Sequence, residues 1–195
     1  MIHGPPGTGK TSTLAKVAVE LVADPSVKIL ITSGSNVGVD NLILAIAELV
    51  GESKSIIRFG NPSRASPSVS KYLVDEVVLT KLKANPEYTE LIQKIENYRQ
   101  EIDKLESSGK TVDPKEIAHL ESQINDCFDK ISKKEDEVIK SLSSSYQIFA
   151  ATLCSIYDRK MGIMKESFSI KKDMFKYVLI DEAGQALNYL LYIGI

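Results

Sequence analysis

Residues 4–11 read GPPGTGKT and fit the pattern G-x-x-x-x-G-K-[ST], a loop that binds nucleotide phosphates at the start of a helix. In such a loop, glycine lets the backbone wrap around the phosphates with several N–H groups pointing inward. Lys10 is expected to neutralise charge on the β- and γ-phosphates, and Thr11 to hold a magnesium ion. The predicted nucleotide site consists of Gly4, Pro5, Pro6, Gly7, Thr8, Gly9, Lys10, Thr11 and Ser12.

Helix and strand patterns alternate around this loop. Helices are predicted over residues 11–22 and 36–50. The inward face predicted for the first helix consists of Leu14, Val17, Leu21 and Val22. Short apolar runs, typical of strands buried on both faces, cover residues 27–32, 55–59, 146–154 and 175–181. This order predicts an α/β fold with a parallel sheet and helices on both of its faces.

The middle of the chain is unusually charged and has a different period. Residues 81–145 carry 11 Lys/Arg and 14 Asp/Glu, which is 25 of the 50 charged residues in the chain (24 plus 26). Apolar residues recur there at alternating spacings of three and four on both sides of a break at residues 107–110. This heptad pattern predicts an inserted antiparallel α-helical hairpin, with Asp113 and Pro114 starting its second helix and Cys127 buried in the seam. We therefore divide the chain into residues 1–80, 81–145 and 146–195.

Composition excludes several classes of protein. The net charge of −2 means that the chain as a whole has no excess of positive charge to attract nucleic acid. Any nucleic-acid binding would therefore require a local surface. Two cysteines and two histidines form neither a disulfide framework nor a zinc-binding pattern. No apolar run reaches the roughly 20 residues of a membrane span. We expect an intracellular protein, cytoplasmic or nuclear, that does not bind membranes.

A second candidate site follows an apolar strand in the sequence YVLIDEAGQ, residues 177–185. The strand would deliver Asp181 and Glu182 at its carboxyl end, beside the phosphates. Asp181 is expected to help hold magnesium, and Glu182 to orient and deprotonate an attacking water. By itself, an Asp-Glu pair after a strand is also typical of a solvated turn. Together with the phosphate loop, it indicates a nucleotide-hydrolysis site.

Five stretches taken in order carry a family resemblance: IHGPPGTGKT, SGSNVGVDNL, RFGNPSR, ATLC and VLIDEAGQAL. Their order and spacing, from residue 2 to about residue 187, resemble the superfamily 1B DNA/RNA helicases of the DNA2/NAM7 type. That group includes the nonsense-decay helicase, senataxin and the immunoglobulin mu-binding protein helicase. The resemblance implies the first RecA-like domain of an ATP-dependent helicase, with ATP, Mg²⁺ and single-stranded DNA or RNA as its ligands.

The resemblance also implies roles for individual residues. The catalytic set would be Lys10, Asp181, Glu182 and Gln185, where Gln185 senses the γ-phosphate and the attacking water. Ser35, Asn36 and Thr152 would contact the nucleic-acid backbone. Ser35 and Asn36 are also suited to capping the helix that follows, and the two roles are compatible. Arg58 and Arg64 are interpreted as surface ion-pairing residues, with a functional role as ligands as the alternative.

The sequence departs from the family pattern at both ends. The family has a strand and an adenine-binding glutamine ahead of the phosphate loop, and a second RecA-like domain with an arginine finger after the region corresponding to residue 187. We therefore expect a truncated motor whose second RecA-like domain is a missing partner. Two alternatives remain open at this stage. One is a P-loop kinase or GTPase, and the other is an inactive remnant whose coiled-coil hairpin binds a protein partner.

We predict that residues 1–195 alone neither unwind duplexes nor hydrolyse ATP at a helicase-like rate. In nucleotide hydrolases that use an arginine finger, this group contributes about 10³ to 10⁵ in rate. Translocation also requires two domains that close on ATP and open on release. ATP turnover is to be measured with and without single-stranded DNA or RNA. Robust, strand-stimulated turnover that disappears in Glu182→Gln would contradict the prediction.

Overall fold

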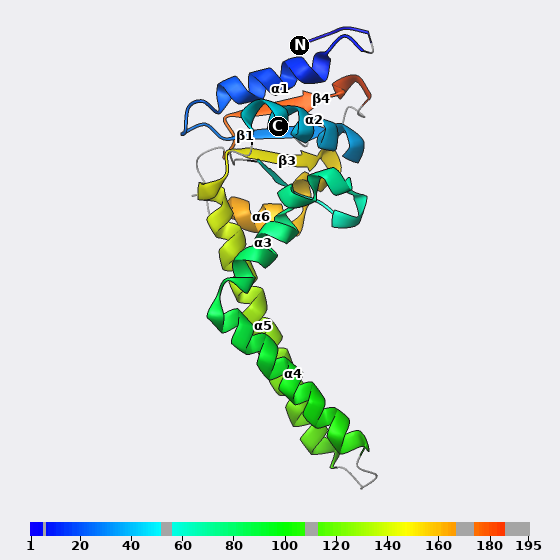
Figure 1. Ribbon diagram of the computed structural model, residues 1–195, viewed down its shortest axis with the longest axis vertical. Coiled ribbons are helices and arrows are strands. Elements are labelled where there is room, and N and C mark those ends of the chain that lie inside the picture. The colour runs from blue at the N-terminus through cyan, green and yellow to red at the C-terminus, as the bar shows by residue number, and fades with distance from the viewer. Residues whose placement is uncertain (6, 52–55, 108–112, 167–173, 186–195) are drawn as a thin grey trace. The chain divides into compact units, whose positions relative to one another are not determined.

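The structure, a computed structural model, describes residues 1–5, 7–51, 56–107, 113–166 and 174–185 (Figure 1). The chain divides into two compact units. The sheet unit comprises Met1–Val77 and Ile139–Ile195, and the helical unit comprises Val78–Val138. The phosphate-loop sequence and the YVLIDEAGQ sequence therefore belong to the same unit, although most of the chain separates them.

A four-stranded parallel sheet forms the centre of the sheet unit, with the strand order β2-β3-β1-β4. Three of the four strands lie within the apolar runs identified in the sequence, β1 extends one residue beyond its run, to Ser33, and the predicted parallel sheet is confirmed. In register, the last residue of β1 lies between the last residues of β3 and β4, so three carboxyl ends meet at one edge. The strands are β1 (Ile29–Ser33), β2 (Ile56–Arg58), β3 (Ile148–Thr152) and β4 (Tyr177–Asp181).

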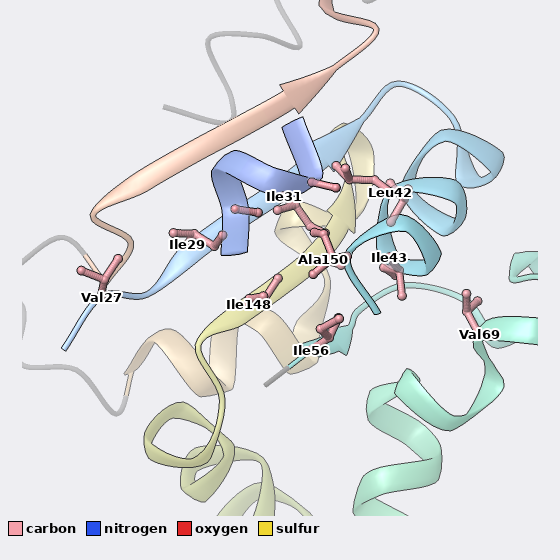
Figure 2. Close-up of a cluster of buried hydrophobic side chains, with 13 residues drawn as sticks. Val27, Ile29, Ile31, Leu42, Ile43, Ile56, Val69, Ile148 and Ala150 are labelled. Atoms are coloured by element: carbon pink, nitrogen blue, oxygen red, sulfur yellow. The ribbon is translucent and has the colours of Figure 1, made fainter. Parts of the chain in front are cut away.

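Two helices, α1 (Lys10–Leu21) and α2 (Asn36–Val50), share an apolar core with one face of this sheet (Figure 2). Alternate strand residues supply the sheet's part of this core, namely Ile29, Ile31, Ile56, Ile148 and Ala150. Helix α1 contributes the fully buried Ala15 and Ala18. The predicted inward face of α1 is wrong at Val17, which is 37% exposed, because the small alanines rather than the larger valine occupy the contact.

The remaining strand residues point to the opposite face, as the period of two in a strand requires. Leu30, Ile57 and Phe149 are all buried there. The ring of Phe149 lies 6.4 Å from that of Phe59 and 5.3 Å from that of Phe175, measured between centroids. Both faces of the central strands are thus covered by apolar groups, which explains why these strands read as continuous apolar runs.

The helical unit contains the predicted antiparallel pair, formed by α4 (Pro86–Ser107) and the portion of α5 (Pro114–Ser145) that belongs to this unit. Leu91 and Ile95 of α4 pack against Cys127 of α5 in a buried cluster. Nearer the start of α4, Glu87 pairs with Lys134 at 2.5 Å. Residue numbers rise on one helix as they fall on the other, so the helices run antiparallel. Cys127 is 5% exposed, which confirms its predicted place in the seam.

Several short elements were not predicted from the sequence. They are α3 (Val74–Lys83), α6 (Arg159–Glu166) and the 3-10 helices η1 (Pro62–Arg64), η2 (Pro67–Tyr72) and η3 (Leu153–Tyr157). The predicted strand over residues 146–154 is too long at both ends, because β3 begins only at Ile148 and η3 begins at Leu153. Elements of fewer than three turns show too few residues for a hydrophobic period to identify them.

The close approach of α2 to β1 predicts a penalty for Gly38→Ala. A Cβ at Gly38 would lie 2.9 Å from Ser33 Cβ and 2.3 Å from Ser33 Oγ, so the helix or the strand end would have to shift. We expect the free energy of unfolding to fall by about 1–3 kcal/mol in urea denaturation.

The matched control is Gly162→Ala, because Gly162 also lies in a helix but nothing is within 4 Å of its added Cβ. There we expect a gain of up to about 1 kcal/mol from helix propensity. Equal effects of the two substitutions would show that the contact with Ser33 does not limit the packing of α2.

Candidate nucleotide and nucleic-acid site

The phosphate-loop residues form a turn that ends where α1 begins. Gly7 and Gly9 both have φ of 79°, a left-handed conformation that favours glycine. Lys10 is the first residue of α1, and its Nζ donates hydrogen bonds to the carbonyl oxygens of Gly4 at 2.7 Å and Pro5 at 2.8 Å. The ammonium group therefore binds back to the carbonyl oxygens at the start of the loop.

The other predicted loop residues are placed as follows. Thr8 Oγ1 donates to the carbonyl oxygen of Pro5 at 2.8 Å, which closes the turn. Ser12 lies in the first turn of α1 and is exposed. Pro6 lies outside the described residues. The loop is thus held by its own hydrogen bonds, with its side chains largely open to solvent.

Thr11 and Asp181 are joined by a hydrogen bond, although 170 residues separate them. Thr11 Oγ1 donates to Asp181 Oδ2 at 2.8 Å. Thr11 lies in the first turn of α1, and Asp181 is the last residue of β4, which pairs with β1. Asp181 is only 7% exposed. The two residues expected from the sequence to share a magnesium ion are therefore brought together by the fold.

Glu182 follows Asp181 in an unusual backbone conformation. Its φ is 55°, and its backbone N–H donates to Asp181 Oδ1 at 3.0 Å. Both carboxylate oxygens of Asp181 consequently have fixed partners, while the side chain of Glu182 is exposed. Gln185 ends the short helix η4 (Ala183–Gln185), and its side chain is outside the described part of the structure.

Ser35 and Asn36 lie at the same edge of the sheet, just after β1. Ser35 is the N-cap of α2, and its hydroxyl accepts a hydrogen bond from the backbone N–H of Gly38 at 2.9 Å. The capping role predicted for Ser35 is therefore confirmed, and the one predicted for Asn36 is wrong. Asn36 is the first helical residue and is partly exposed, and its Oδ1 accepts a hydrogen bond from Arg58 Nη2 at 3.0 Å.

Arg58 is not a surface residue, contrary to its interpretation from the sequence. Its exposed fraction is 1%, and its Nε donates to Asp40 Oδ1 at 2.7 Å in a buried ion pair. Asp40 Oδ2 accepts from the backbone N–H of Ser66 at 2.7 Å. The sequence signal that was missed is Asp40 itself, an acidic residue on the inward side of an otherwise apolar helix, where burial demands a charged partner.

Thr152 ends β3 and caps the short helix η3. Its Oγ1 accepts from the backbone N–H of Ser155 at 3.2 Å, and the two hydroxyl oxygens are 2.8 Å apart. A Cβ at Gly60 would lie 2.9 Å from Ser155 Oγ and 3.8 Å from Arg58 Nη1. Gly60, with φ of 113°, thus lets the turn after β2 pass close to the Thr152 loop.

A pocket of about 370 Å³ lies beside α2 and the segment that follows β2. The buried Asp40 and the exposed Arg64 both line it. The other lining residues are Val37, Asn41, Leu44, Ser63, Ala65 and Ser66. Arg64, in contrast to Arg58, is therefore at the surface as expected.

Within the described ranges, no three or more His, Cys, Asp or Glu side chains are grouped so that they could hold a metal ion. A magnesium ion in a nucleotide site needs fewer protein ligands, because phosphate oxygens and waters complete its coordination. Among the described helices, none is both long and apolar enough to cross a membrane.

The chain matches the protein family described as "AAA domain" over residues 1–195. It is 30% identical over 190 residues to DNA-binding protein SMUBP-2 of Rattus norvegicus, covering 96% of this chain and 17% of that protein. It is 30% identical over 189 residues to DNA polymerase alpha-associated DNA helicase A of Schizosaccharomyces pombe, with 96% and 26% covered. DNA replication ATP-dependent helicase/nuclease dna2 of Schizosaccharomyces pombe is 37% identical over 76 residues, covering 39% of this chain and 5% of that protein.

The parallel sheet, the glycine-rich loop before α1 and the acidic residue at the end of β4 define a RecA-like P-loop NTPase domain. The chain belongs to the AAA domain family, as the ATP-binding motor domain of superfamily 1 helicases of the DNA2/NAM7 type. The resemblance stated from the sequence is confirmed, and nothing in the comparisons supports the kinase, GTPase or remnant alternatives. The chain spans 17% and 26% of the length of the first two relatives named above.

The buried ion pair predicts unequal costs for single and double substitutions. Arg58→Met would leave Asp40 charged and buried without its partner, and we expect the free energy of unfolding to fall by about 3–5 kcal/mol. Arg58→Met combined with Asp40→Leu removes both charges and is expected to recover most of this loss. Urea denaturation followed by circular dichroism gives the comparison.

Arg64→Met serves as the control, because Arg64 is exposed and its substitution is expected to change stability by no more than about 0.5 kcal/mol. If the double variant were as unstable as Arg58→Met, the loss would come from packing and not from the unpaired charge of Asp40.

Proposed function

We propose that this chain binds and hydrolyses ATP in a motor that acts on single-stranded DNA or RNA. The observation that carries the proposal is the hydrogen bond between Thr11 and Asp181, since it unites the two sequence motifs that such chemistry requires. The family match and the printed names of the relatives, which include DNA-binding and helicase proteins, support the same function.

The phosphate loop and the start of α1 would hold the ATP phosphates. Backbone N–H groups and the positive end of the helix favour anionic groups there. Lys10 would exchange its carbonyl partners on Gly4 and Pro5 for β- and γ-phosphate oxygens, which are stronger acceptors for an ammonium group. The remaining loop residues shape the backbone around the phosphates and carry no charge of their own.

Thr11 and Asp181 fit a magnesium ion. A hydroxyl and a carboxylate at the same point are hard oxygen ligands of the kind that Mg²⁺ prefers, and Asp181 is already held by the backbone N–H of Glu182. When bound, the ion would neutralise charge on the β- and γ-phosphate oxygens. Glu182, exposed beside this pair, would accept a proton from the attacking water, and Gln185 would help to position that water.

Ser35, Asn36 and Thr152 would contact the nucleic-acid strand. All three are polar residues that lie at or just after the carboxyl ends of neighbouring strands β1 and β3. Hydroxyl and amide groups of this kind bind phosphate and sugar oxygens, and such contacts carry no sequence information. The nucleic-acid strand would therefore be bound independently of its base sequence.

Further parts of the proposal concern the wider protein. A second RecA-like domain would supply the arginine that completes ATP hydrolysis, and the helical unit offers a surface for a protein partner. We also place the protein inside the cell, in the cytoplasm or nucleus, where ATP and single strands occur together. Its free Cys127 and Cys154 are suited to a reducing compartment.

The ATP site predicts that Lys10→Ala abolishes the binding of a fluorescent ATP analogue by residues 1–195. The substitution removes a point charge from the phosphates and leaves the buried core of the sheet unit intact. Lys133→Ala, at an exposed position of α5, is the control and should bind as wild type does. Circular dichroism checks that both variants fold, and equal binding by Lys10→Ala and wild type would refute the assignment.

A further inference from the structure

Arg58 connects the segments that carry the candidate nucleic-acid contacts, although it is itself almost inaccessible. Its backbone is fixed within β2, which pairs with β3. Its guanidinium donates to Asp40 and Asn36 of α2, and its third nitrogen, Nη1, faces the Gly60 turn. One side chain therefore holds α2, and its Nη1 nitrogen lies near the turn that passes beside the loop of Thr152.

The hydrogen bond from Arg58 determines which way the amide of Asn36 points. Because Asn36 Oδ1 accepts from Arg58 Nη2 at 3.0 Å, its Nδ2 group is directed away from the guanidinium. Within the described part of the chain, Nδ2 has no hydrogen-bond acceptor. An amide donor that is fixed in orientation and partly exposed suits an acceptor oxygen of a phosphate or sugar.

Asp40 extends the same network to the pocket. One carboxylate oxygen holds Arg58, and the other accepts from the backbone N–H of Ser66, which also lines the pocket. The guanidinium cannot shift without disturbing this carboxylate. The orientation of the Asn36 amide and the position of the Ser66 segment are therefore set together by one buried ion pair.

We infer that Arg58 is a positioning residue for the single strand, which it orients through the amide of Asn36 without contacting phosphate. This inference rests on the proposed function and adds a residue to its nucleic-acid site. Burial supports an indirect role, because a side chain 1% exposed cannot approach the highly charged backbone of a strand. A planar guanidinium is also required, because lysine has a single charged nitrogen and cannot hold Asp40 and Asn36 in the same fork.

The test uses residues 1–195 with labelled oligo-dT and oligo-U, and measures affinity by fluorescence anisotropy at several salt concentrations. Arg58→Lys is expected to weaken strand binding about fivefold, the effect of one neutral hydrogen bond. The slope of log affinity against log salt should stay as in wild type, because no phosphate contact is lost. Binding of an ATP analogue should also be unchanged, which a general loss of structure would not allow.

A double-mutant cycle tests whether Arg58 acts through Asn36. Asn36→Ala should weaken strand binding as Arg58→Lys does, and the combined variant should be no weaker than Asn36→Ala alone. Additive losses, a reduced salt slope or wild-type strand binding by Arg58→Lys would each overturn the inference. Lys133→Ala is the control for a charge lost at an exposed position of the helical unit.

Two further outcomes are informative. If Arg58→Lys does not fold, Arg58→Met combined with Asp40→Leu replaces it, since that pair leaves no buried charge unpaired, and the same loss of affinity is expected. If the wild-type chain binds ATP but neither oligonucleotide, the proposed strand-binding function fails and the inference falls with it. If the wild-type chain binds single strands and the Arg58 variants bind them with the same affinity, the proposed function stands and only the inference about Arg58 is wrong.

Discussion

The parallel pairing of β1 with both β3 and β4 is the constraint on which the site depends. Parallel strands in register bring their carboxyl ends to one edge, so the residues that follow them are neighbours whatever their distance along the chain. Thr11 reaches Asp181 across 170 residues only because α1 packs on the sheet that contains β4. The same pairing places Ser33 between Thr152 and Asp181, which puts the candidate nucleotide and strand contacts on one edge.

Glycine residues allow backbone segments to approach one another closely at this edge of the sheet. Gly38 lets α2 lie against the end of β1, and Gly60 lets the turn after β2 pass Ser155. Around these contacts, the polar groups are held by each other: Asp181 by Thr11 and Glu182, and Asp40 by Arg58 and Ser66. A buried carboxylate needs such partners, because an unpaired charge away from water is costly. The site is therefore rigid where its carboxylates are buried and exposed where ligands would bind.

The helical unit follows a different physical rule. Its helices are rich in charged residues and bury a narrow seam, with Leu91, Ile95 and Cys127 at its centre. Such a pair is stabilised by local contacts between two long helices and does not depend on the parallel sheet. This separation explains how half of the chain's charged residues can be concentrated in one insertion while the sheet unit remains apolar enough to form a core.

The sequence by itself determined the phosphate loop, the four strands, α1, α2 and the antiparallel hairpin, because each depends on local period, glycine placement or capping residues such as Ser35 and Asp113. It also determined the family, because the order and spacing of the motifs can be read directly from the sequence. Only the tertiary structure decided that Val17 faces solvent, that α3 and α6 are helices, and that Arg58 is buried. These features depend on partners distant in sequence: an arginine becomes a buried residue only when the fold brings Asp40 within hydrogen-bonding distance.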